Sequence, residues 1–430
     1  MRTPARRRAH VAMIGVPIVS HVLPSLEVVR ALVARGHRVT YANDPAVAGL
    51  VTSAGAEFVP CRSTLPVATG DWPDDPIAAG RIFLDDAVQA LPRLRESYGP
   101  DPADLYLYDI GAYAARALAE AQGRPLLQLS PTFVAWRGYE EEVAAHLRRL
   151  PGADAYRAAF ADWLARCGAT TTDPDVFAGP PGRSLALIPR AMQPHADRVD
   201  TDVVTFVGLC SGPRATRESW TRPEGAARVL LVSLGTQYTR QPEFYRNCVA
   251  AFGGLPGWHV VLQIGEHTDP AALGPVPDSV EVRSWVPQSA ILEEADAFVT
   301  HAGMGGSGEG LCTATPMIAV PQGAEQFQNA DRLVELGVAC RIDTPDATPE
   351  ALRAALMELT GSAEVARRAR ELRAHALAEG GTPRAVSLIE EMLHEMPDSE
   401  LPHGEMPGGE LPHGEMPGGE LPEGEGARGR

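Results

Sequence analysis

The chain has 430 residues, which is too long for one ordinary hydrophobic core and suits two or three domains of roughly 150–200 residues. Its hydrophobic content of 44% and charged content of 22% are normal for a globular protein, and no run approaches the roughly 20 apolar residues that span a bilayer. The net charge of −17 would repel the phosphates of a polynucleotide. These values exclude a fibrous, disordered or integral membrane protein, and we expect neither a nucleic-acid nor a membrane partner.

The basic and sulfur-containing residues narrow the chemistry further. All 38 basic side chains are arginine, which excludes a Schiff-base lysine and a lysine-bearing phosphate loop. The six cysteines are scattered without a C-x-x-C pair, which favours reduced thiols and a cytoplasmic protein over a zinc or disulfide framework. The apolar run Val11–Val19 follows four arginines (Arg2, Arg6, Arg7 and Arg8), as in a signal peptide. The run is short and no small-residue cleavage site follows it, so it predicts a buried strand and not an export signal.

The first half of the chain alternates strand and helix patterns. A continuous apolar run at 11–16 is followed by a helical pattern that ends at Gly36 and by a strand at 37–41, which together form a βαβ unit and imply a parallel sheet. Further strands are predicted at 105–108 and 126–129, with a helix at 112–121 between them.

The same alternation restarts in the second half, where strands are predicted at 229–233, 259–264, 280–283, 297–300 and 317–320. The segment between the halves is rich in Gly, Pro, Ser and Arg and is predicted to be a linker. The fold class is therefore α/β, with two doubly wound Rossmann-like domains facing a central cleft where ligands should bind. The predicted boundaries are 9–207 for the first domain, 208–225 for the linker and 226–394 for the second domain.

The last segment, 395–430, differs in composition from everything before it. The ten residues Glu400–Gly409 are repeated without change at Glu410–Gly419. Nine acidic residues and two arginines give this segment −7 of the net charge, and its Pro, Gly and Glu content cannot bury enough apolar surface to order it. We therefore predict a disordered acidic tail.

The densest functional signal is the segment His301–Gly310, which reads HAGMGGSGEG and follows the predicted strand 297–300. Glycines at a turn between a strand and a helix let backbone N–H groups approach an anion, and the helix N-terminus adds a partial positive charge. Without lysine, a phosphate would be held by these groups, by His301, by Ser307 or by arginine. The segment also fits G-x-G-x-x-G, which on its own leaves an NAD(P)-dependent oxidoreductase or a structural turn as alternatives.

The surroundings of this segment carry a more specific pattern. Trp285-Val286-Pro287-Gln288 lies upstream, Glu309 stands eight residues after His301, and Glu325-Gln326 follow. The order W-x-P-Q, H-x-G, an acid and D/E-Q resembles the sugar-nucleotide signature of the family 1 glycosyltransferases, which have the GT-B fold. The resemblance spans residues 9–392 and is strongest to the bacterial macrolide glycosyltransferases.

The resemblance implies that these residues bind a UDP-sugar. Trp285 would stack on the uracil ring, and the backbone of Val286 would read the edge of the base. A glutamine and a carboxylate would bind the ribose hydroxyls, the glycine turn and its histidine would hold the diphosphate, and the acid–glutamine pair would bind the sugar. The full set is Gly235, Thr236, Trp285, Val286, Gln288, His301, Gly303, Gly305, Gly306, Ser307, Glu309, Glu325 and Gln326.

A matching catalytic motif stands in the first half. His21-Val22-Leu23-Pro24 resembles the family's G-H-x-x-P loop, whose histidine is the general base, although Ser20 and Leu23 replace the glycine and asparagine usual in the macrolide subgroup. Asp109 ends a predicted strand, so a parallel sheet would bring it to His21, where it would fix the ring tautomer. One base without an enzymic nucleophile implies a single displacement with inversion at the anomeric carbon.

The acceptor is less well defined by the sequence. The resemblance implies a hydrophobic, macrolide-like natural product, modified on a hydroxyl in antibiotic biosynthesis or resistance. Asp173-Pro174-Asp175 fits the metal-binding pattern D-x-D, but no apolar strand precedes it, and we expect no metal. The candidate acceptor residues are apolar and aromatic side chains of the first domain: Leu65, Trp72, Phe83, Phe133, Trp136 and Tyr139.

Together these patterns predict an inverting, UDP-sugar-dependent glycosyltransferase, with UDP-glucose as the first donor to test. The UDP-sugar would be a co-substrate, so no cofactor is expected, and a homodimer is left open. Two alternatives remain at this point: an NAD(P)-dependent oxidoreductase, and a non-catalytic GT-B partner protein, the latter suggested by the altered residues around His21.

Overall fold

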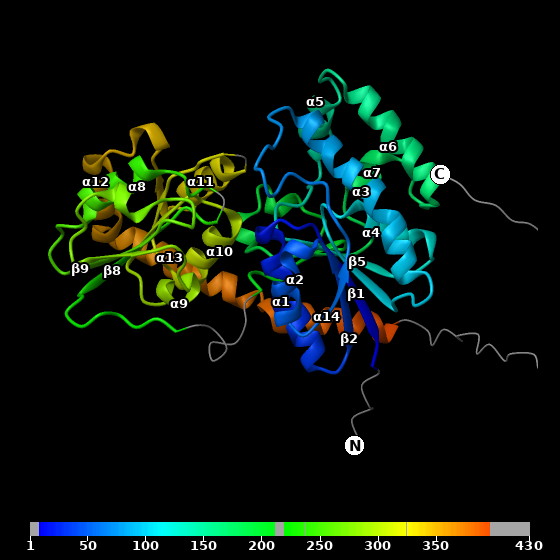
Figure 1. Ribbon diagram of the computed structural model, residues 1–430, viewed down its shortest axis with the longest axis horizontal. Helices are drawn as coiled ribbons and strands as arrows, with labels where there is room; N and C mark the ends of the chain where they lie inside the picture. The colour runs from blue at the N-terminus through cyan, green and yellow to red at the C-terminus, as the bar shows by residue number, and fades with distance from the viewer. Residues whose placement is uncertain (1–7, 211–218, 237, 324, 396–430) are drawn as a thin grey trace, which may run out of the picture.

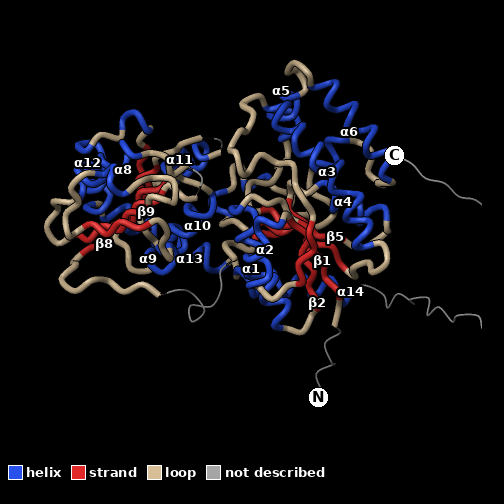
Figure 2. The backbone as a smooth tube through the Cα atoms, in the orientation of Figure 1, coloured by secondary structure: helices blue, strands red, loops and turns tan. Residues whose placement is uncertain are grey.

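The computed structural model describes residues 8–210, 219–236, 238–323 and 325–395. Two parallel β-sheets, each covered by helices, form two domains that lie side by side (Figures 1 and 2). The middle of the predicted linker and the predicted tail beyond Glu395 lie outside the described residues. Within the described residues, no helix has the length and apolar content needed to cross a bilayer.

The first domain contains a seven-stranded parallel sheet with the order β3-β2-β1-β4-β5-β6-β7. Its strands are β1 His10–Ile14, β2 Arg38–Asn43, β3 Glu57–Pro60, β4 Leu105–Asp109, β5 Leu126–Ser130, β6 Ser184–Ala186 and β7 Val204–Phe206. Its helices are α1 Val19–Ala34, α2 Ala48–Ser53, α3 Pro76–Tyr98, α4 Tyr113–Ala121, α5 Ala145–Leu147, α6 Ala153–Cys167 and α7 Pro174–Ala178.

Strand β1 shows why the first predicted strand is a continuous apolar run. Val11 and Met13 pack into the core on the side of α1, whereas Ala12 and Ile14 pack into the core formed with α3 and α4. A parallel strand that is buried on both faces does not need alternating polar residues.

The second domain contains a six-stranded parallel sheet with the order β10-β9-β8-β11-β12-β13. Its strands are β8 Arg228–Ser233, β9 Trp258–Gln263, β10 Val280–Arg283, β11 Ala297–Thr300, β12 Met317–Ala319 and β13 Ala339–Arg341. Its helices are α8 Pro242–Phe252, α9 Gln288–Leu292, α10 Met304–Thr313, α11 Gln326–Glu335, α12 Pro349–Gly361 and α13 Ala363–Ala378.

The last helix, α14 (Gly381–Glu395), corrects the predicted boundary of the second domain. Figure 1 shows α14 in orange beneath the first domain, beside α1. Its residues Val386 and Ile389 belong to the core that surrounds β1 and α1, and Glu390 accepts a 2.7 Å hydrogen bond from Arg35. The apolar spacing of this helix indicated that one face is buried, but it could not indicate which domain buries it.

The two domains meet at a short 3₁₀ turn of the first domain, η3 (Arg190–Met192). Arg332 of α11 donates a 2.8 Å hydrogen bond to the carbonyl of Ala191, and Glu379, which follows α13, accepts two hydrogen bonds from the backbone N–H of Arg190. Burial raises the pKa of the Glu379 carboxyl to about 7, although the N–H and the charge of Arg190 act in the opposite direction. Side chains of the second domain therefore bind two backbone groups of this turn, the N–H of Arg190 and the carbonyl of Ala191.

Candidate active site

The polar residues of the predicted site lie at equivalent points of the two sheets. Each sheet reverses its strand order between its first and fourth strands, β1 and β4 in one domain and β8 and β11 in the other. His21 follows β1 and Asp109 ends β4, while Gly235 follows β8 and His301 follows β11. Ligands of doubly wound sheets bind at these switch points, beyond the carboxyl ends of the strands.

His21 and Asp109 form the predicted catalytic pair. The Nδ1 atom of His21 lies 2.9 Å from Oδ2 of Asp109. Asp109 is almost fully buried, and its Oδ1 accepts a 2.8 Å hydrogen bond from the N–H of Gly111. Because a carboxylate can only accept, a neutral His21 donates from Nδ1 and keeps Nε2 free to take a proton.

The electrostatic surroundings make His21 a stronger base than an ordinary histidine. Burial lowers its pKa, but the charge of Asp109, their hydrogen bond and the charge of Glu325 together raise it above the usual 6.5. Glu325 belongs to the second domain, so the donor-side carboxylate and the base are close enough to interact across the domain boundary.

The structure corrects the local conformation around His21. The sequence predicted a loop, but His21 lies in the first turn of α1, and Pro24 is inside the helix. Pro24 has no N–H to donate to the carbonyl of Ser20, and this missing bond is the local cost of continuing the helix through a proline. Leu23, two residues after His21 in the same helix, is 49% exposed.

The glycine-rich segment is mostly helical, which corrects the prediction of a glycine turn. Only His301, Ala302 and Gly303 form the turn, and α10 begins at Met304 with Gly303 as its N-cap. The following glycines allow close packing: a methyl group on Gly306 would contact Thr300. A methyl group on Gly308 would contact Pro189 of the first domain and Leu209, which follows that domain in the chain. The free amides at the start of α10 remain suited to a diphosphate.

Ser307 does not fit its predicted role. It is fully buried in α10, and its Oγ atom has no hydrogen-bond partner in the described structure. A diphosphate could not reach this hydroxyl. Gly305, in the first turn of the same helix, is exposed, and no atom lies within 4 Å of the position where its Cβ would stand. Its backbone is therefore accessible to a ligand.

His301 is wedged between two glycines. Gly235 has φ +75°, and a Cβ there would stand 2.7 Å from Cε1 of His301, while a Cβ on Gly303 would collide with Nε2. Burial lowers the pKa of His301 to about 4, and the backbone of Ser233 offsets this only in part. His301 is therefore neutral at pH 7 and offers a phosphate a hydrogen bond but no positive charge.

The predicted ribose residues are brought together. Glu309 of α10 accepts a 2.5 Å hydrogen bond from Nε2 of Gln288 and another from the hydroxyl of Ser289. Nearby in the sequence, the indole of Trp285 is 55% exposed and available for stacking, whereas Val286 is buried. Ser289 was not predicted, and its only sequence signal is its position directly after Gln288.

Glu325 and Gln326, the predicted sugar-binding pair, differ in their exposure to solvent. Glu325 is exposed just before α11. Gln326 is buried, and its Oε1 accepts a 2.9 Å hydrogen bond from the N–H of Gln322, so this side chain supports the loop before α11. Tyr238, which was not predicted, has its hydroxyl against Gly323, and burial and the charge of Glu325 raise its pKa. Thr236, another predicted residue, is exposed.

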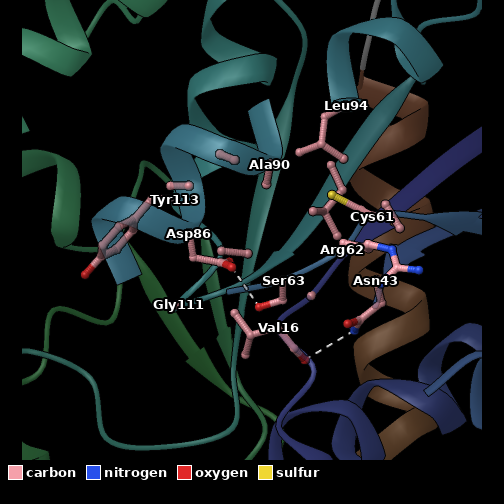
Figure 3. Close-up of a pocket in the computed structure, with 16 residues that line it drawn as sticks. Val16, Asn43, Cys61, Arg62, Ser63, Asp86, Ala90, Leu94, Gly111 and Tyr113 are labelled. Carbon is pink, nitrogen blue, oxygen red and sulfur yellow. Dashed lines mark hydrogen bonds between the residues drawn. The ribbon is translucent and has the colours of Figure 1, made fainter. Parts of the chain in front are cut away.

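A pocket of the first domain lies at the carboxyl ends of β1 to β3 (Figure 3). Its lining includes Val16, Gly111 and Tyr113, and Asp86 in it accepts a 2.7 Å hydrogen bond from the hydroxyl of Ser63. The turn after Asp109, through Gly111, thus joins the catalytic carboxylate to this pocket.

The predicted acceptor residues fall into separate groups. Trp72 and Phe83 stack with ring centroids 6.2 Å apart, and Phe83 lies against Gly111 at the pocket. Trp136 and Tyr139 form a second aromatic pair, with ring centroids 5.0 Å apart. Leu65 is buried in the core beside α3, and Phe133 packs at the core that both domains share.

The D-x-D residues have local partners. Asp173 is the N-cap of α7 and accepts from the N–H of Asp175, and Asp175 forms ion pairs with Arg148 and Arg157. These contacts account for both carboxylates structurally.

Comparisons with known proteins agree with this architecture. Residues 254–392 match the family described as erythromycin biosynthesis protein CIII-like, C-terminal domain. The chain is 54% identical to oleandomycin glycosyltransferase of Streptomyces antibioticus over 92% of this chain and 94% of that protein. It is 31% identical to NDP-glycosyltransferase YjiC of Bacillus licheniformis over 89% of this chain and 98% of that protein.

Solved structures show the same fold over most of the chain. The glycosyltransferase of kitacinnamycin is 49% identical, with a TM-score of 0.83 over 90% of this chain and 99% of that one. The calicheamicin glycosyltransferase CalG4 is 32% identical, with a TM-score of 0.80 over the same shares of the two chains.

Two doubly wound domains with these matches define a glycosyltransferase of the GT-B fold. The chain belongs to the glycosyltransferase family that includes oleandomycin glycosyltransferase. The oxidoreductase alternative is therefore wrong: the glycine-rich segment that fits G-x-G-x-x-G belongs to the second domain of a glycosyltransferase.

Proposed function

We propose that the protein is an inverting glycosyltransferase that moves a sugar from a UDP-sugar to a hydroxyl of a macrolide-like natural product. Glucose is the sugar that we propose first. The observation that carries the proposal is the hydrogen-bonded pair His21–Asp109 at the switch point of the first sheet, within electrostatic range of Glu325 of the second domain.

The chemistry follows from the two sides of this boundary. An acceptor hydroxyl has a pKa far above neutrality, so it needs a base as it attacks. Nε2 of His21 takes the hydroxyl proton, and Asp109 stabilises the imidazolium that forms. The acceptor oxygen forms a bond to the anomeric carbon while the bond from that carbon to the UDP oxygen breaks, and the electron pair leaves with UDP. Attack opposite the leaving group inverts the anomeric configuration.

The leaving diphosphate would be stabilised by the first amides of α10 and by neutral His301. Glu309 and Gln288 offer an acceptor and a donor to a pair of vicinal hydroxyls, which favours ribose, and hence UDP, over the deoxyribose of dTDP. The exposed indole of Trp285 would stack on the base.

The acceptor class rests on the relatives. Oleandomycin glycosyltransferase and the glycosyltransferase of kitacinnamycin are named for natural products. The stacked pair Trp72 and Phe83, with Phe83 against Gly111, offers apolar surface of the kind that such acceptors need. We also propose a cytoplasmic location, where sugar nucleotides are available and the six free cysteines stay reduced.

The test is mass spectrometry of reactions that pair UDP-glucose, other UDP-sugars and dTDP-sugars with a panel of macrolides and unrelated phenols. The proposal predicts a hexose adduct on a macrolide with UDP-glucose. Activity with dTDP-sugars alone would overturn the donor assignment, and no product with any pair would favour a non-catalytic partner protein.

A further inference from the structure

The turn that precedes α10 contains a backbone conformation that its residue disfavours. Ala302 has φ +59°, in the left-handed region where glycine is the usual residue. The side chain of Ala302 is fully buried, so solvent does not ease this conformation. A strained residue next to a binding site persists only when surrounding contacts hold it in place.

Two side chains hold this turn. The hydroxyl of Thr300, at the end of β11, accepts a 3.1 Å hydrogen bond from the N–H of Ala302. Nδ2 of Asn329, from α11, donates a 2.9 Å hydrogen bond to the carbonyl of Ala302. Both backbone polar groups of the strained residue are therefore fixed by side chains from other elements.

Asn329 is an unusual residue for its position. It is fully buried, and within the described structure its Oδ1 atom has no hydrogen-bond partner. A buried amide that leaves its acceptor unpaired destabilises the fold relative to an apolar residue of the same size. The hydrogen bond from Nδ2 of Asn329 to the carbonyl of Ala302 is the favourable interaction that offsets this cost.

The turn matters because it leads directly into the groups that are proposed to hold the diphosphate. The chain has no lysine, and His301 is neutral at pH 7. The first amides of α10 are therefore a main candidate for binding the diphosphate, and their position follows from the turn at Ala302 and Gly303. A small change in this turn would misdirect His301 and the helix start together.

We propose that Asn329 is a positioning residue for donor binding: its amide holds the left-handed turn at Ala302 so that the start of α10 faces the diphosphate of the donor. Asn329 does not itself contact the donor. This inference rests on the proposed function, since it assumes that the second domain binds a nucleoside diphosphate.

The experiment is a double-mutant cycle on Asn329 and Ala302. Calorimetric titration measures the affinity for UDP, and for dTDP as a second probe, and thermal melting measures the stability of each variant. Asn329→Ala removes one hydrogen bond and is expected to weaken UDP binding roughly fivefold. Ala302→Gly is expected to bind UDP as the wild type does, because glycine adopts the left-handed region without strain. In the double variant, Ala302→Gly is expected to restore most of the affinity that Asn329→Ala loses.

The matched control is Leu333→Ala, a change at another fully buried residue of α11. It should lower the melting temperature without changing UDP affinity. If Asn329→Ala does not fold, Asn329→Leu keeps the volume of the side chain while removing the donor, and the same loss and rescue are expected.

Equal effects of Asn329→Ala and Leu333→Ala on UDP affinity, or no rescue by Ala302→Gly, would overturn the positioning role while leaving the proposed function intact. A wild-type protein that binds neither UDP nor dTDP would overturn both. In kinetics, the inference predicts that Asn329→Ala raises the KM for the UDP-sugar more than it lowers kcat at saturating donor.

Discussion

Nδ1 of His21 lies 2.9 Å from Oδ2 of Asp109, although the two residues are 88 positions apart in the chain. They meet because β1 and β4 are neighbours in the first sheet, so the residues that follow one strand and end the other reach the same point. The pair gives the site a base whose free nitrogen, Nε2, is fixed by a buried carboxylate. Most of what the structure predicts about catalysis depends on this relationship.

The first prediction is a pH profile. His21 must be neutral to accept a proton, and its pKa is raised above 6.5, so kcat/KM for the acceptor should fall as pH decreases through a value above 6.5. Asp109→Asn removes the charge that raises this pKa, and the ionisation should then move to lower pH while turnover falls. An Asp109→Asn enzyme with an unchanged profile would show that another group titrates.

The second prediction uses two neighbouring glycines. A methyl group on Gly303 collides with His301, so Gly303→Ala should lower both the melting temperature and the affinity for UDP. Gly305 has open space at its Cβ position, so Gly305→Ala should leave the melting temperature unchanged or higher, because alanine favours a helix by roughly 1 kcal/mol. If the diphosphate lies on the start of α10, Gly305→Ala should still weaken UDP binding. If calorimetry showed that Gly305→Ala binds UDP with unchanged affinity, the diphosphate would not lie at the start of α10.

The third prediction concerns the ribose. Glu309→Ala should weaken UDP binding by roughly tenfold or more, because charge-assisted hydrogen bonds contribute about 1.5–3 kcal/mol each. Binding of dTDP, which lacks one of the two hydroxyls, should weaken less. Ser289→Ala is the matched variant: it removes a hydrogen bond to the same carboxylate and should have a smaller effect of the same kind. Equal losses for UDP and dTDP would contradict the ribose assignment.

The fourth prediction concerns stability at the domain boundary. The Glu379 carboxyl has a pKa of about 7 in the folded protein against an ordinary value of 4.5, so between these pH values the folded state binds more protons than the unfolded state. Stability should therefore fall as pH rises from about 5 to 7. Glu379→Gln mimics the protonated form, and its melting temperature should match that of the wild type near pH 5 and exceed it near pH 8. If the melting temperatures of the wild type and of Glu379→Gln change with pH in the same way across this range, the raised pKa of Glu379 would be contradicted.

The sequence was sufficient for the elements that are buried on both faces. The strand predicted at 297–300 is β11 with the same ends, because the apolar run 297–299 lies between polar residues and has few other structures available. The pairing of His21 with Asp109 was also predictable, since parallel strands place their carboxyl ends at one edge.

Other features depend on contacts that sequence patterns do not show. Glycine and proline usually interrupt helices, so the helical state of Pro24 and of the segment after Gly303 was missed. Packing decides both: Gly308, for example, lets α10 approach Pro189 of the other domain. The burial of Ser307 and the support given by Asn329 are likewise set by neighbours distant in the chain.

The role of His21 as the base is tested by glycosyl transfer from UDP-glucose to a macrolide acceptor, measured by mass spectrometry for the wild type and for His21→Ala. UDP affinity is measured in parallel. We expect an inverted glycoside from the wild type and turnover lowered by roughly 10²–10⁴-fold in the variant. UDP affinity should be equal in the two proteins, because the base and the proposed nucleotide site lie on different domains. Turnover near the wild-type rate in His21→Ala would contradict this role and assign the proton to a different base.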